Sequence, residues 1–193
     1  MRRVLFGILF ALIGASGLAL AGIASALVLE NQDSFCAACH TEPEVTFFQR
    51  ASQEKKVDLA AYHTAEKTRC IDCHSGSGLF GRVKGLQQGA HDLLTFLSGN
   101  YHKPAITTNP LGDDACIKCH TNVEIRPPTA SRTGTGHYHY FLPQWQMEDR
   151  AAAQCITCHP SHLVGIERLA FMPQGKVGET CDQCHTALSG KIK

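Results

Sequence analysis

The stretch Cys36-Ala-Ala-Cys39-His40 is the first of five copies of one pattern: two cysteines separated by two residues and followed at once by a histidine. The chain has 193 residues with 10 Cys and 11 His, and the five copies use every cysteine. The other copies are Cys70-Ile-Asp-Cys73-His74, Cys116-Ile-Lys-Cys119-His120, Cys155-Ile-Thr-Cys158-His159 and Cys181-Asp-Gln-Cys184-His185. Cysteines in this number and order indicate a metal or redox role.

This pattern is the attachment sequence of c-type haem, in which two thiols bond to the porphyrin vinyl groups and the adjacent histidine is the proximal iron ligand. Five disulfides, or zinc ribbons built from the cysteine pairs, are the alternatives, but neither requires a histidine after each pair. The sequence therefore predicts five covalently bound haem c groups. All ten motif cysteines would attach them, and the proximal ligands would be His40, His74, His120, His159 and His185.

Five haems leave little protein for an ordinary core, because residues 31–193 provide only about 33 residues for each haem. We expect the haems to form the interior, with short helices and irregular loops around them. The predicted fold is mainly α with much loop, a multihaem cytochrome c fold organised around five covalent haems and preceded by one transmembrane helix.

The N-terminal segment has the composition of a membrane anchor. Residues 4–29 carry no charged side chain, which is long enough to span a bilayer. Arg2 and Arg3 precede this run, and cations on that side predict a cytoplasmic N-terminus. We therefore expect residues 1–30 to cross a bacterial-type cytoplasmic membrane once and residues 31–193 to lie in the periplasm.

A cleaved signal peptide is the alternative for this segment. Both Ala19-Leu20-Ala21 and Ala24-Ser25-Ala26 resemble the small-residue sites at which signal peptidases cut. The apolar run is longer than the usual signal-peptide core of about 7–15 residues, which favours a retained anchor.

Six histidines lie outside the motifs and are the candidates for the distal iron ligands. A haem with histidine on both sides is closed to substrates and suits electron transfer. Six candidates for five distal positions leave at least one histidine spare. They are His63, His91, His102, His137, His139 and His162.

Three segments between the motifs have a readable local structure. Residues 44–62 have a helical composition without Gly or Pro, and residues 122–143 look like a loop because they contain several Pro and Gly. Residues 79–98 follow a helical hydrophobic period. On that helix Lys84 and His91 share a stripe, and glycines at 81, 85 and 89 would let a porphyrin or another helix approach closely.

The N-terminal anchor, the run Asp33-Ser34-Phe35-Cys36-x-x-Cys39-His40, a histidine before the second motif, and Cys155-x-x-Cys158-His159 with a trailing His162 together resemble a known family. The chain resembles the NapC/NirT family of membrane-anchored, quinol-oxidising multihaem cytochromes c over residues 1–165. The resemblance implies that menaquinol or ubiquinol is oxidised near the first haem, at the outer face of the membrane.

The resemblance also suggests roles for individual residues. Family members carry a quinol-site lysine on the helix after the second motif, which Lys84 matches, and an Asp or His one heptad later, which His91 matches. We therefore expect His91 to be the distal ligand of the first haem and Lys84 to donate a hydrogen bond or a proton. His91, Asp92 or a haem propionate would accept the proton that quinol releases. Other irons would be bound by His63, by His137 or His139, and by His162.

The sequence departs from the family pattern in two places. Thr41-Glu42-Pro43 follows the first motif where some relatives have an iron-binding methionine, so methionine ligation is not expected there. Residues 166–193 add a fifth haem to the tetrahaem part formed by residues 31–165, and its distal ligand would be His102 or the spare member of the pair His137 and His139.

These observations favour an electron-transfer protein that oxidises membrane quinol and passes electrons to a periplasmic reductase or soluble cytochrome in anaerobic-type respiration. An electron-carrying subunit of a larger membrane complex, with quinol chemistry on another chain, is the main alternative, and association of several copies stays open. A reductase with an open iron is less favoured because distal histidines are plentiful. The net charge of +1 and the lack of basic clusters argue against nucleic acid as a partner.

Overall fold

The structure of the chain is a computed structural model that describes residues 2–39, 42–107, 109–121, 123, 136–167 and 171–189. Within these ranges the fold is mainly helical and has no strand, which confirms the expected class at that level. The helices are α1 (Arg2–Leu29), α2 (Asp33–Cys39), α3 (Glu44–Ser52), α4 (Leu59–Ala65), α5 (Cys70–His74), α6 (Gly78–Ser98), α7 (Asp114–Ile117), α8 (Gly136–Glu148), α9 (Cys155–Cys158) and α10 (Gln174–Ala187).

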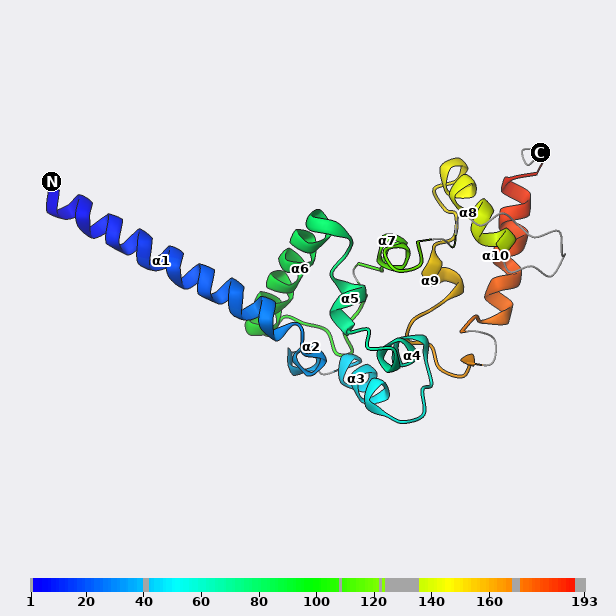
Figure 1. Cartoon of the computed structure of the whole chain (residues 1–193), viewed down its shortest axis with the longest axis horizontal. Coiled ribbons are helices and arrows are strands. Elements are labelled where there is room, and N and C mark those ends of the chain that lie inside the picture. Colours follow the sequence, from blue (N-terminus) through cyan, green and yellow to red (C-terminus); the bar gives the residue numbers. More distant parts are fainter. Residues whose placement is uncertain are drawn as a thin grey trace.

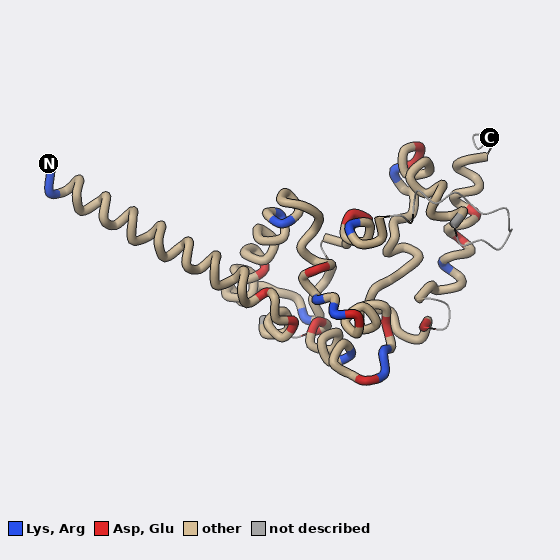
Figure 2. The backbone as a smooth tube through the Cα atoms, viewed as in Figure 1, with Lys and Arg blue, Asp and Glu red and all other residues tan. Residues whose placement is uncertain are grey.

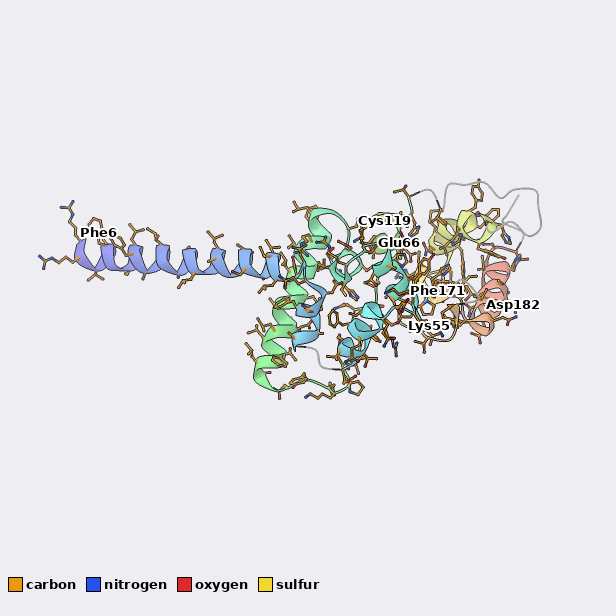
Figure 3. The ribbon with its side chains drawn as sticks, turned by 60° about the horizontal axis from the view of Figure 1, so that its bottom comes forward. Phe6, Lys55, Glu66, Cys119, Phe171 and Asp182 are labelled. Atoms are coloured by element: carbon orange, nitrogen blue, oxygen red, sulfur yellow. The ribbon has the colours of Figure 1, made fainter. Side chains whose placement is uncertain are left out.

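The N-terminal helix α1 projects from the rest of the chain as one long apolar rod (Figure 1). Its large side chains are exposed, as Phe6 illustrates in Figure 3, and Figure 2 shows basic residues only at its start. Among the described residues α1 is the one helix long and apolar enough to span a membrane, although signal sequences near an N-terminus share this composition.

The helices that carry the five motifs follow one another in chain order, leading away from α1 (Figure 1). The order is α2, α5, α7, α9 and α10. Direct contacts connect α2 with α3 and α5, α5 with α7, and α9 with α10. The body of the molecule is therefore elongated, with the first motif beside the apolar helix and the fifth at the far end.

Very few side chains in the described residues are buried. The buried apolar residues are Ala61, Ala115, Trp145, Ala153 and Leu188. Three of them, Trp145, Ala153 and Leu188, form a small cluster that fastens the end of α10 to α8. Protein interiors are normally close-packed, so these residues do not supply the core that a domain of this size requires.

The helix expected over residues 44–62 is divided in two. α3 ends at Ser52 and α4 begins at Leu59, with residues 53–58 between them. The side chain of Asp58 accepts a hydrogen bond from the backbone N–H of Ala61 at 2.8 Å and so caps α4. The prediction of one continuous helix was wrong because an N-cap residue starts a new helix where composition alone shows no break.

The loop expected over residues 122–143 contains the start of α8, which begins at Gly136 and includes Pro143. Residues 124–135 lie outside the described residues, so the loop prediction is wrong only for its last part. Phe141 and Leu142 pack against the cluster around Trp145. Tertiary packing outweighs the unfavourable proline in this segment.

Helix α6 matches its prediction closely and runs from Gly78 to Ser98. Gly99 caps its C-terminal end in a left-handed backbone conformation, with a φ of +74°. A Cβ at Gly81 would lie 2.8 Å from the backbone carbon of Gly76, so this glycine permits a close approach to the end of α5. Gly89 has no such neighbour within 4 Å.

Candidate cofactor-binding cavity

One continuous cavity of about 1490 Å³ runs through the body of the molecule. Ordinary small-molecule sites hold roughly 300–1,000 Å³, so this space exceeds that of a single small ligand. Every motif cysteine with a described side chain lines it: Cys36, Cys70, Cys73, Cys116, Cys119, Cys155, Cys158, Cys181 and Cys184. Four motif histidines line it as well: His74, His120, His159 and His185. The side chain of Cys39 and the whole of His40 lie outside the described residues.

Among the described residues the cysteines form neither disulfides nor a cluster of the kind that binds zinc. All nine cysteines with described side chains are free, and the described residues contain no group of three or more His, Cys, Asp or Glu that could hold a metal ion. A zinc ribbon needs four such ligands, whereas a haem iron takes four nitrogens from the porphyrin and needs only one or two protein ligands.

Three motif histidines face a second histidine across this cavity. The ring centroids are 6.1 Å apart for His63 and His120, 6.1 Å for His137 and His185, and 6.3 Å for His139 and His159. Because a metal–imidazole bond is about 2.0 Å long, two rings on opposite sides of one iron have centroids roughly 6.3 Å apart. Each pair therefore has the spacing of two axial ligands.

His162 and His74 line the same cavity. Burial lowers the pKa of His162, although Asp58 acts in the opposite direction, so the ring favours the neutral form that binds metals. Its Nδ1 is buried and has no hydrogen-bond partner among the described residues.

Side chains around His162 hold its ring and backbone in place. Phe47 of α3 stacks on the ring, with centroids 3.9 Å apart and planes 4° from parallel. Arg50 donates one hydrogen bond to the backbone oxygen of His162 at 3.2 Å and another to the buried carboxylate of Asp58 at 3.5 Å. Sequence analysis missed these three residues because nothing in their local pattern connects them to a histidine about 100 positions later.

Neighbouring motifs are joined through their first cysteines. A thiol–thiol hydrogen bond connects Cys36 to Cys70; it lowers the pKa of Cys36 to about 7 and raises that of Cys70. Asp33 accepts a hydrogen bond from the backbone N–H of Cys70 at 2.9 Å. The first and second sites therefore adjoin.

The third and fourth motifs repeat this arrangement. Cys116 and Cys155 share a thiol–thiol hydrogen bond, and Asp113 accepts from the backbone N–H of Cys155 at 2.6 Å. Asp33 and Asp113 each stand three residues before the first cysteine of a motif. This Asp-x-x-Cys repeat was the signal in the sequence that could have identified both aspartates as structural partners of the next motif.

The predicted quinol-site residues of α6 point in different directions. Asp92 lines the cavity and accepts a hydrogen bond from Gln88 at 2.7 Å. Lys84 and His91 do not line it, and the His91 side chain is 74% exposed. The exposed His102 does not line it either. The structure thus brings Asp92 to the cavity but not His91. Because His40, the proximal histidine of the first motif, lies outside the described residues, the expected role of His91 as ligand of the first iron stays a prediction.

Comparisons of this chain with protein-family models, with curated proteins and with solved structures found no match. The resemblance to the NapC/NirT family therefore depends on the motif residues and their order alone. The residues described above nevertheless fit covalently attached haem: thiols, imidazoles and apolar side chains line one cavity together.

Proposed function

We propose that this chain is a membrane-anchored pentahaem cytochrome c that oxidises quinol and relays the electrons to a periplasmic acceptor. The observation that carries this proposal is the single cavity lined by nine free cysteines and by histidine rings paired at 6.1 to 6.3 Å. A haem iron with two histidine ligands accepts and donates one electron without binding substrate, which is the chemistry a relay requires.

The pairing of histidines supports one ligand assignment. His63 would serve the third motif, His139 the fourth and His137 the fifth. His162 would serve the second motif, because it lines the same cavity as His74 and has a buried Nδ1 without a hydrogen-bond partner among the described residues. Ligands that come from other parts of the chain bind neighbouring sites into one body. Such interleaving suits a relay, because the sites must keep fixed distances from one another.

The end of the cavity near α1 supports quinol access from the membrane. Gly22, Ile23 and Ala26 of α1 line the same cavity as the first two motifs, so a molecule in the bilayer beside α1 has an apolar route to them. Asp92 lines this cavity, and its carboxylate would accept the proton that quinol releases. Lys84 keeps the role implied by the family resemblance, that of a donor at the outer edge of this region.

The opposite end of the molecule is the proposed exit for electrons. The fifth motif lies on α10, at the end of the elongated body farthest from α1 (Figure 1). Its side chains reach solvent, since His185 is exposed and still lines the cavity. A soluble reductase or cytochrome could approach this end without contacting the membrane.

The test is anaerobic mixing of the oxidised, detergent-purified protein with a menaquinol analogue while the reduced haem absorption band is followed. We expect rapid reduction of the wild type. The variants Asp92→Asn and Lys84→Ala should each slow it by at least about tenfold, since a positioned proton-transfer group contributes that much or more.

Lys176→Ala on α10 is the matched control, because Lys176 is an exposed lysine at the far end, paired with Glu179. It should be reduced at the wild-type rate. If dithionite reduces every haem but quinol reduces none, the chain is a relay fed by another subunit and the quinol-oxidising part of the proposal is wrong.

A further inference from the structure

Helix α6 exposes large apolar side chains near its two ends, on either side of residues 83–93, the part of the helix that lines the cavity. The exposed fractions are 77% for Leu79, 90% for Phe80, 68% for Leu94 and 70% for Leu97, and none of the four lines the cavity. At about 100° per residue they occupy one face of the helix. An apolar surface of this kind on a charged, exported protein indicates a partner.

The position of α6 relative to α1 identifies that partner. Arg82, in the second turn of α6, forms an ion pair with Glu30, the residue that follows α1. Beyond this contact α6 runs steeply across the direction of α1 in both views (Figures 1 and 3). Because a membrane-spanning helix stands within about 20° of the bilayer normal on average, a helix that crosses its end steeply lies along the membrane surface.

The charges on α6 fit the same orientation. Lys84 and His91 border the apolar face, and no charged residue follows Asp92 before the helix ends at Ser98. Just beyond the helix, the Lys103 ammonium lies 5.2 Å from the ring of Tyr101. Interfacial helices carry cations at the edge of the apolar face, where they meet lipid phosphates, and aromatic rings favour the same depth.

We propose that Leu79, Phe80, Leu94 and Leu97 form a lipid face that lies in the outer boundary of the membrane that α1 spans. The inference rests on α1 being an anchor and does not depend on haem or quinol chemistry. Over 21 residues α6 is about 30 Å long, so the lipid face would hold the exported body against the bilayer in a fixed orientation. The anchor alone would leave that body free to swing.

The experiment reconstitutes the full chain into vesicles of phosphatidylethanolamine and phosphatidylglycerol that contain a phospholipid with a photoreactive diazirine in mid-chain. After illumination, peptide mass spectrometry maps the lipid adducts. We expect adducts on α1 and on the lipid face, with a yield on α6 on the order of tenfold above that on α8, although Met147 of α8 is 81% exposed.

A matched pair of variants sharpens the test. Phe80→Glu with Leu94→Glu should reduce the adducts on α6 on the order of tenfold and leave those on α1 unchanged, because carboxylates are excluded from the acyl region. Met147→Glu on α8, at an exposed side chain that does not line the cavity, should change neither. Circular dichroism of each variant checks that the helices persist, and the wild-type map decides the question even if a variant misfolds.

Three results would overturn the proposal. Adducts on α1 without adducts on α6 would show that the lipid face stands clear of the bilayer. A lack of adducts on both helices would mean that the chain is not anchored by α1. Photo-crosslinks from α6 to a second copy of the chain, in place of lipid, would make this face a protein interface.

Discussion

His63 and His120 come from segments almost sixty residues apart, yet their rings lie 6.1 Å apart across the cavity. We predict that His63→Met raises the reduction potential of one haem on the order of 0.1 V, because thioether ligation favours ferrous iron relative to imidazole. A spectroscopic redox titration should show one haem shifted among five.

His102→Met is the control for this change, because His102 is exposed and does not line the cavity. Its titration should match that of the wild type. Identical titrations for both variants would mean that the pair His63 and His120 does not bind iron.

Asp58 is the second residue whose role can be measured directly. Its side chain is 1% exposed, caps α4 and pairs with Arg50, which also holds the backbone of His162. Asp58→Asn keeps a capping oxygen but removes the countercharge, so it should lower the free energy of unfolding by about 1–3 kcal/mol.

Denaturant unfolding of the holoprotein, followed by circular dichroism, measures this loss. Asp182→Asn on α10 is the comparison, since Asp182 is exposed and its replacement should change stability by no more than about 0.5 kcal/mol. Equal denaturant midpoints for the two variants would show that Asp58 does not help to hold His162 in place.

Two glycine substitutions test how the helices are packed, one in α6 and one in α10. Gly81→Ala should destabilise the contact between α6 and the turn that follows α5, because the new methyl group would lie 2.8 Å from the backbone of Gly76 and backbone cannot move aside cheaply. Gly178→Ala on α10 meets nothing within 4 Å. It should stabilise the protein by about 0.5–1 kcal/mol, as alanine does inside a helix.

Thermal unfolding of both glycine variants beside the wild type should give opposite shifts in the unfolding temperature if α6 packs against the turn after α5 as described. Two upward shifts would show that the close approach at Gly81 is absent in solution.

The elements differ in how well their sequences predict them. The charge-free run of α1 and the hydrophobic period of α6 are local signals, and both helices match their predictions within two residues. α8 could not be predicted, because the packing of Phe141 and Leu142 against the cluster around Trp145 outweighs the local effect of Pro143. The break between α3 and α4 depends on the single cap at Asp58.

In the candidate site, too, local sequence predicts some features and tertiary contacts decide the others. The motif spacing alone predicts the ten cysteines and their histidines as one set of sites. The partner of each histidine was left open, since that choice depends on how distant segments meet: His137 faces His185 while His139, two residues later, faces His159. His91 and Asp92 are adjacent in sequence, and only the rotation of α6 decides which of them reaches the cavity.

At the scale of the whole molecule, the chain has a cavity where a domain of its length has a core. Five apolar residues of the described chain are buried, while about 1490 Å³ of space is lined by thiols and imidazoles. Covalent cofactors in that space would supply the missing apolar contacts and would bind distant segments together. If the proposal is right, the haem-free chain should unfold, because its own apolar residues supply so little of a core.

The most direct test of this account is the intact mass of the protein purified from cells that can attach haem c, measured under denaturing conditions that release every non-covalent ligand. The account predicts a mass equal to the polypeptide plus five haems, with no cysteine left to react with a thiol reagent. A bare polypeptide mass with ten reactive thiols, or a mass lowered only by the hydrogens lost in forming disulfides, would contradict it.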